Sequence, residues 1–237
     1  MGSNANVGEA IKCSRPILSN IKNGKTVVKL QSCNRSAVFK RIFDLVFATS
    51  MLLMLAPLMV VIACLIRFQD GGKSVYSQDR IGGNGKVFKC LKFRSMIINS
   101  KEVLEELLAT DPVAAADWEK NQKLKHDPRV THLGAFIRKT SLDELPQLWN
   151  IIRGEMSLVG PRPIVENEVK KYGEFFDYYK SVKPGITGLW QVSGRSGTTY
   201  DERVQFDVTY AKTTSFWTDI KIVLGTVPAV LFSKGAY

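Results

Sequence analysis

Two adjacent carboxylates, Asp143 and Glu144, occur in the segment SLDELPQLWN, just before a proline and an apolar run. Such a pair can attack an electrophile, hold a metal ion or cap a helix. Ser141 and Glu144 match the capping box, in which a serine and a glutamate three residues later each satisfy a free backbone N–H group. Because short motifs often match by chance, the local pattern by itself favours the structural role.

The remaining residues make phosphoryl transfer the chemistry to consider. An aspartate, with an ordinary pKa of about 3.9, is ionised at neutral pH and can attack phosphorus without a general base. This suits a chain with two histidines, which flank a turn at residues 126–132. A glutamate beside it could bind Mg²⁺, which is usually held by one or two carboxylates plus substrate phosphates. The basic residues that could neutralise a pyrophosphate are Lys92, Arg94, Arg138, Arg162 and Arg195.

The net charge of +11 indicates an anionic partner, which is nucleic acid, an acidic membrane surface or a phosphorylated substrate. The sequence has no concentrated basic helix and no RNA-binding motif, which argues against nucleic acid. Its four cysteines are scattered without a C-x-x-C pair, so neither a zinc site nor a disulfide framework is indicated. The glycine cluster at 82–85 lacks the spacing of a phosphate-binding loop.

Residues 45–66 form an apolar run without a charge, which is long enough for membrane insertion. Basic residues flank the run on both sides, so the N-terminal flank is expected to be cytoplasmic. Pro57 lies in the middle of this run. A proline inside a helix lowers the stability of the helix by about 3 kcal/mol. Each half is then about ten residues, or roughly 15 Å of helix, which is half the hydrocarbon thickness. The run is therefore either a re-entrant helix bent at Pro57 or a kinked spanning helix.

The pattern along the chain predicts a helix-rich α/β protein associated with a membrane. We expect a polar N-terminal tail at residues 1–36, a membrane helix at 37–68 and one catalytic domain at 69–237. Within the domain, residues 74–94 read as a strand hairpin that places Lys92 and Arg94 on one face. Helices are expected at residues 100–109, from residue 112, from about residue 146, at 165–182 and at 216–232, and the last of these is expected to lie at the membrane interface. Residues 185–197 read as loop or strand.

Three segments resemble one family: KCLKFRSM, FIRKTSLDELPQLWNIIRGEMSLVGPRP and PGITGLWQVSGR. They are similar to the bacterial monotopic phosphoglycosyl transferases, which are polyprenol-phosphate sugar-1-phosphate transferases. The similarity is dense from about residue 38 onward. It implies a helix bent at Pro57 that enters and leaves the bacterial inner membrane, and a catalytic domain on the cytoplasmic face. Many members have serine before the bend proline, whereas this chain has Ala56, so a hydroxyl that would hold the bend is missing.

The resemblance also implies the roles of the site residues. Asp143 would take the sugar phosphate covalently, and Glu144 would bind Mg²⁺. The nucleotide sugar would be surrounded by Lys92, Arg94, Arg138, Arg162 and Arg195. The implied partners are a UDP-sugar, undecaprenyl phosphate and inner-membrane lipid, with no nucleic acid. The resemblance thus favours chemistry at the carboxylate pair, although a capping role for Ser141 remains compatible with it.

The stretch at about 97–130 and the ending SKGAY resemble the hexose branch of the family, in particular undecaprenyl-phosphate galactose phosphotransferases. We therefore expect transfer of galactose-1-phosphate, with glucose-1-phosphate as the alternative. That branch often carries further N-terminal membrane helices, which this sequence lacks, so we expect the short form that starts exopolysaccharide, O-antigen or capsule subunits. The alternative from another class is a non-catalytic basic adaptor on a membrane surface.

Overall fold

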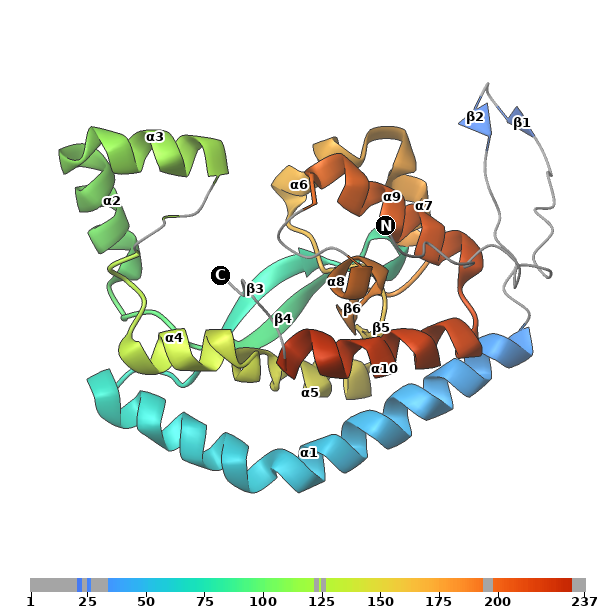
Figure 1. The fold of residues 1–237 in the computed structure, drawn as a ribbon, viewed down its shortest axis with the longest axis horizontal. Coiled ribbons are helices and arrows are strands. Elements are labelled where there is room, and N and C mark those ends of the chain that lie inside the picture. The colour runs from blue at the N-terminus through green and yellow to red at the C-terminus, as the bar shows by residue number, and fades with distance from the viewer. Residues whose placement is uncertain are drawn as a thin grey trace, which may run out of the picture.

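A computed structural model describes residues 21–22, 25–26, 34–121, 124, 127–193 and 198–231. Most of the expected N-terminal tail lies outside these residues, as does Arg195. In the described part of the tail, β1 (Ile21–Lys22) pairs with β2 (Lys25–Thr26). From Asn34 onward the chain forms one long helix, followed by a hairpin and a group of shorter helices on one side of that helix (Figure 1).

The long helix α1 (Asn34–Asp70) contains Pro57 and is the one described helix that is long and apolar enough to cross a membrane. Figure 1 shows it bent about its middle, with both ends rising toward the rest of the molecule. Proline explains a bend there, because it lacks the N–H of the helical bond and its ring clashes with the preceding turn. Large apolar side chains of α1 are exposed rather than packed: Val38, Phe39, Ile42, Val46, Leu53, Met54, Leu58, Val60, Val61, Leu65 and Phe68.

The predicted hairpin is confirmed. Strand β3 (Val75–Ile81) pairs antiparallel with β4 (Val87–Phe93), and the turn η1 (Gly83–Gly85) joins them. Tyr76 lies opposite Lys92 and Arg80 lies opposite Phe88. Because opposed residues point to the same side of a sheet and the side alternates along a strand, Arg80, Cys90 and Lys92 share one face.

The expected helices are present, with more breaks than the sequence indicates. The middle of the chain forms α2 (Ser100–Thr110), α3 (Pro112–Asn121), α4 (His132–Lys139), η2 (Leu142–Glu144), α5 (Gln147–Arg153) and β5 (Ser157–Val159). The remainder forms α6 (Glu166–Tyr172), η3 (Gly173–Phe175), α7 (Phe176–Lys180), β6 (Gly185–Thr187), α8 (Leu189–Ser193), α9 (Tyr200–Thr213) and α10 (Phe216–Leu231). The region expected as loop or strand at 185–197 thus contains the strand β6, paired parallel with β5, and the short helix α8.

Each arm of α1 packs against its own part of the domain. Ala48 in the first arm belongs to a buried cluster with Leu148 of α5 and Tyr210 of α9. Ile62 in the second arm belongs to another cluster, with Ile137 of α4. Leu145, the residue that follows the two carboxylates, packs against both clusters. The turn η2 lies against α4 and β4, and Leu145 directly after it packs against clusters that include both arms of α1.

Candidate active site

The carboxylate pair does not cap a helix, so the predicted capping box is wrong. Ser141 has φ 57° and ψ 15°, which is left-handed backbone, and its side chain makes no capping bond. A capping residue needs extended backbone instead. The backbone N–H of Ser141 donates to the carbonyl of Arg138 at 3.1 Å, so this turn belongs to the end of α4. It redirects the chain into η2, which carries Asp143 and Glu144, and α5 follows with Pro146 at its cap position.

Lys92 brings the two carboxylates and the hairpin together. Its Nζ lies 2.7 Å from Glu144 Oε1 and 3.4 Å from Asp143 Oδ2. Asp143 is the more enclosed of the two, with 13% of its side chain exposed against 27% for Glu144. The sequence predicted the three residues as one site, and the structure places them in contact across about fifty positions of chain.

The two carboxylates differ in their electrostatic surroundings. Burial raises the pKa of Asp143, and the Lys92 ammonium offsets part of that effect. Burial acts in the same direction on Glu144, but Lys92 and Arg162 outweigh it, so the pKa of Glu144 lies below its ordinary value. The anionic form is thus more favoured at Glu144 than at Asp143, which suits a metal ligand. Asp143 is the less stabilised anion, which suits a nucleophile.

Two of the predicted arginines lie close to the carboxylates. Arg138 on α4 donates from Nε to Ser95 Oγ at 2.8 Å, and its charge acts on Asp143. Arg162 is held between the buried residues Pro161 and Pro163, which fixes its backbone. Within the described part of the chain, Arg162 makes no hydrogen bond and no ion pair, so its guanidinium is available to a ligand.

Arg94, which shares a strand face with Lys92, has a different position from the one expected. Its guanidinium pairs with the Asp70 carboxylate at the end of α1 and lies 3.5 Å from the carbonyl oxygen of Ile66. Arg94 thus ties the second arm of α1 to β4. The structure does not bring it to the carboxylates, and Arg195 cannot be placed because it lies outside the described residues.

The structure adds residues that sequence reasoning missed. A pocket beside Glu144 is lined by Arg80, Cys90, Lys92, Glu144, Gln147, Arg162, Pro163, Gly185, Ile186 and Gln191. Two of the additions carry a signal in the sequence. Arg80 stands at an alternating position of the predicted hairpin, and Gln147 lies three residues after Glu144, which is one helical turn.

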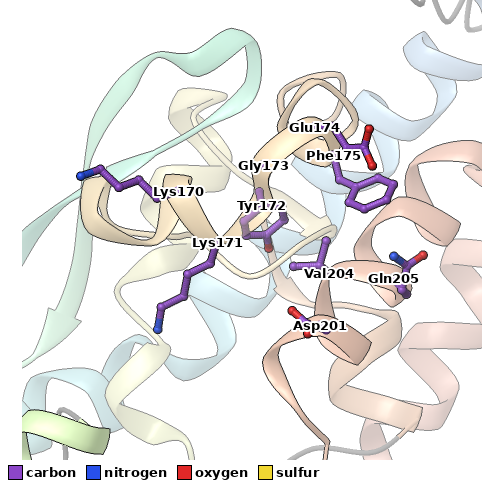
Figure 2. A pocket seen from close by; sticks show the side chains of 9 residues that line it. All are labelled: Lys170, Lys171, Tyr172, Gly173, Glu174, Phe175, Asp201, Val204 and Gln205. Atoms are coloured by element: carbon purple, nitrogen blue, oxygen red, sulfur yellow. The ribbon is translucent and has the colours of Figure 1, made fainter.

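A larger pocket, of about 320 Å³, lies between α6 and α9 (Figure 2). Its lining is Lys170, Lys171, Tyr172, Gly173, Glu174, Phe175, Asp201, Val204 and Gln205. None of these is a predicted site residue. In Figure 2 the side chains of Lys170 and Lys171 extend away from the rings of Tyr172 and Phe175, so charges do not converge on one point. The predicted site residues Lys92, Glu144 and Arg162 line the smaller pocket instead.

The donor set at the carboxylates fits magnesium. Among the described residues no three His, Cys, Asp or Glu side chains form a cluster that could hold a metal by themselves. Structural zinc needs four such ligands. Mg²⁺ instead keeps several waters and binds through one or two carboxylates plus substrate phosphates. Two adjacent, partly exposed carboxylates match that second pattern, and Arg162 beside them makes no ion pair among the described residues.

Comparisons with known proteins identify the family of this chain. The family model described as "Bacterial sugar transferase" matches residues 35–233. The chain is 56% identical to "UDP-galactose-lipid carrier transferase" of Erwinia amylovora over 85% of this chain and 42% of that protein. It is 54% identical to "Undecaprenyl-phosphate galactose phosphotransferase" of Salmonella typhimurium over 85% of this chain and 42% of that protein. It is 51% identical to "Exopolysaccharide production protein ExoY" of Rhizobium meliloti over 84% of this chain and 88% of that protein. The chain thus spans about two fifths of the first two relatives and most of the third.

Proposed function

This chain belongs to the family of bacterial sugar transferases, and we propose that it transfers a hexose-1-phosphate from a UDP-sugar to undecaprenyl phosphate, releasing UMP. Galactose is the favoured hexose, and the reaction would be the first membrane step of exopolysaccharide, O-antigen or capsule assembly. The observation that carries the proposal is the contact of Lys92 with Asp143 and Glu144, with Arg162 beside Glu144. The names of two relatives above half identity, which act on galactose and a lipid carrier, support it.

The geometry supports two successive displacements. In the first, an Asp143 oxygen attacks the β-phosphorus of the donor, and the bond from that phosphorus to the bridging oxygen breaks. UMP leaves with the bonding electrons, and a sugar-phosphoryl-aspartate remains. In the second, an oxygen of undecaprenyl phosphate attacks the same phosphorus and restores the Asp143 carboxylate. No general base is needed for either attack, because both nucleophiles are anions.

Lys92 and the arginines orient the reactants and balance their charge. Lys92 holds both carboxylates in place, while Arg138 near Asp143 and Arg162 near Glu144 would bind phosphate oxygens. Magnesium held through Glu144 would supply neutralisation of the diphosphate, which otherwise repels the Asp143 carboxylate. Phosphoryl transfer depends mainly on such positioning and charge stabilisation.

The position of α1 supports a re-entrant helix on the cytoplasmic face of the inner membrane. Near its start, Lys40 Nζ lies 2.5 Å from Asp219 Oδ2 of α10. Near its end, Asp70 pairs with Arg94 of β4. Both ends thus contact one domain, which lies on one side of the bend (Figure 1). A spanning helix would put one end on the opposite side of the membrane from that domain. The exposed aromatic rings of Phe136, Trp149 and Trp217 lie on α4, α5 and α10, the helices beside α1, and suit the interface.

We expect cysteines placed at both ends of α1 to be accessible from the cytoplasm only. Ala37→Cys and Gln69→Cys would be made in a background without the native cysteines and treated with an impermeant maleimide. Both should label in inverted vesicles and neither in intact spheroplasts. Labelling of the two positions from opposite sides would contradict the re-entrant helix. Pro57→Ala should move part of the population toward a spanning helix, whereas Pro228→Ala, a proline inside α10, should not.

The reaction is tested by UMP release across a panel of UDP-sugars with undecaprenyl phosphate. We expect release with UDP-galactose and less with UDP-glucose. More UMP release with UDP-glucose than with UDP-galactose would support the same reaction with glucose as the hexose. No release with any UDP-sugar, from protein that still binds anionic vesicles, would support the non-catalytic adaptor instead.

A further inference from the structure

We propose that Arg80 is a further substrate-binding residue, which with Arg162 holds the α-phosphate of the donor, the phosphate that leaves as part of UMP. The inference rests on the proposed function and extends it to a residue that sequence reasoning did not identify. Phosphate is the chemistry recognised, and both the donor and the lipid acceptor carry it. The proposal commits to the donor.

Arg80 lies close to the predicted site residues. It lines the pocket beside Glu144 and shares a hairpin face with Lys92. Its side chain is 16% exposed, and its guanidinium donates to the carbonyl of Pro163 at 3.1 Å and to Gln78 Oε1 at 2.8 Å. The Pro163 bond places Arg80 next to Arg162 in space. Both bonds orient the guanidinium, so Arg80 has a fixed position at the pocket.

Arg80 and Arg162 place two positive charges close together. Burial, and after it the neighbouring charge of Arg162, lower the pKa of Arg80. The carboxylate of Glu168 lies 3.7 Å from Arg80 and 3.6 Å from Arg203, so Arg80 shares this anion with Arg203, on which the charge of Asp207 also acts. Arg162 has no carboxylate partner among the described residues. Two like charges side by side in a partly buried position are unfavourable, and a phosphate between Arg80 and Arg162 would offset their repulsion.

Arg80 and Arg162 also lie on the side of the site toward which the leaving group would depart. Arg138 acts on Asp143, whereas Arg80 and Arg162 line the pocket with Glu144, and Asp143 does not line it. In phosphoryl transfer the attacking and leaving oxygens lie roughly in line through the phosphorus. If Asp143 attacks the β-phosphorus, the bridging oxygen and the α-phosphate therefore point away from it. Arg80 and Arg162, which line the pocket with Glu144, are placed to bind the bridging oxygen and the α-phosphate. Negative charge develops on these oxygens as UMP leaves.

The test compares Arg80→Gln with Arg80→Lys in the full chain. The glutamine variant removes the charge and keeps an N–H donor for Pro163, whereas the lysine variant keeps the charge. For Arg80→Gln we expect the inhibition constants of UMP and UDP to rise about tenfold or more, and that of uridine to stay unchanged. The first-turnover release of UMP from UDP-galactose without acceptor should slow by a similar factor. Arg80→Lys should recover part of both losses.

Lys89→Ala is the matched control. Lys89 lies on the same hairpin, is 63% exposed, and pairs with the exposed Asp79 on the opposite face from Arg80. It should change none of these values, because an exposed pair contributes little. Thermal unfolding checks that the Arg80 variants fold.

Several outcomes would overturn the inference. If the inhibition constants of uridine, UMP and UDP all rise equally in Arg80→Gln, Arg80 has a structural role and does not contact the phosphate. An effect confined to the KM of undecaprenyl phosphate would assign Arg80 to the acceptor. If Arg80→Gln fails to fold, Arg80→Met, which also removes the charge, takes its place, and unchanged inhibition constants of UMP and UDP in that variant would reject the inference. If the proposed function itself is wrong, the wild type will release no UMP, which differs from all of these outcomes. The role of Arg80 can then still be tested by comparing the calorimetric binding of UMP to the wild type and to the variant.

Discussion

Asp143→Asn is expected to lower UMP release by about 10⁴-fold or more while leaving the protein folded and membrane-bound, as the loss of a covalent nucleophile does in other enzymes. Asparagine keeps the size of the side chain and one oxygen for Lys92, but its neutral amide is a far poorer nucleophile. Asp143 is 13% exposed, and because asparagine is neutral the substitution introduces no buried charge. UMP release should be followed with and without undecaprenyl phosphate, to separate the two half-reactions.

The covalent intermediate gives this prediction a second readout. Wild-type protein incubated with UDP-galactose and no acceptor should yield an Asp143 peptide carrying a hexose phosphate, and the kinetics should be ping-pong. Asp177→Asn is the matched control, because Asp177 is an exposed carboxylate that pairs only with Lys180 at the surface. If Asp143→Asn retains activity, Asp143 is not the nucleophile, and Asp143 and Glu144 have a structural role. Ternary-complex kinetics without a modified peptide would exclude the covalent route but not the reaction.

Glu144→Gln is expected to lower UMP release by about 100-fold or more and to raise the Mg²⁺ concentration needed for half-maximal rate. The reason is that Lys92 and Arg162 hold the pKa of Glu144 below its ordinary value, so the wild-type group is an anion ready to bind a cation. Chelation of divalent ions should stop release in the wild type, and added Mg²⁺ should restore it.

Glu166→Gln, an exposed carboxylate in the first turn of α6, provides the control and should leave the Mg²⁺ dependence unchanged. A wild type that works in excess chelator would remove the metal from the proposal. A slower Glu144→Gln variant with unchanged Mg²⁺ dependence would instead mean that Glu144 acts by holding Lys92, which it contacts at 2.7 Å.

Local features were readable from the sequence because their causes are local. The alternation at 74–94 and the glycine turn produced the hairpin, with Asn84 at φ 57° in the turn. Asp111 before Pro112 opened α3, and its carboxylate accepts N–H bonds from Val113 and Ala114. The apolar run with Pro57 produced one bent helix. In each case, residues a few positions apart supply both the signal and the contact.

The capping box shows where local reading fails. Thr199 and Glu202 have the same spacing as Ser141 and Glu144, and they do form a capping box at the start of α9. Ser141 does not, because the end of α4 places its backbone in the left-handed region. The glutamate side chain is then available to Lys92. The difference between the two motifs comes from neighbouring elements and not from the motif itself.

The sequence by itself determined the chemical groups of this protein: the carboxylate pair, the lysine on a strand face, the arginine between two prolines and the bent apolar helix. Only the tertiary structure decided which cations meet the carboxylates. Strand alternation predicts that Lys92 and Arg94 share a face, yet Arg94 pairs with Asp70 on α1, while Arg80 joins the pocket. Side-chain direction along a strand is a local property. The partner on the facing element depends on how the two arms of α1 pack against the hairpin, which no short stretch of residues encodes.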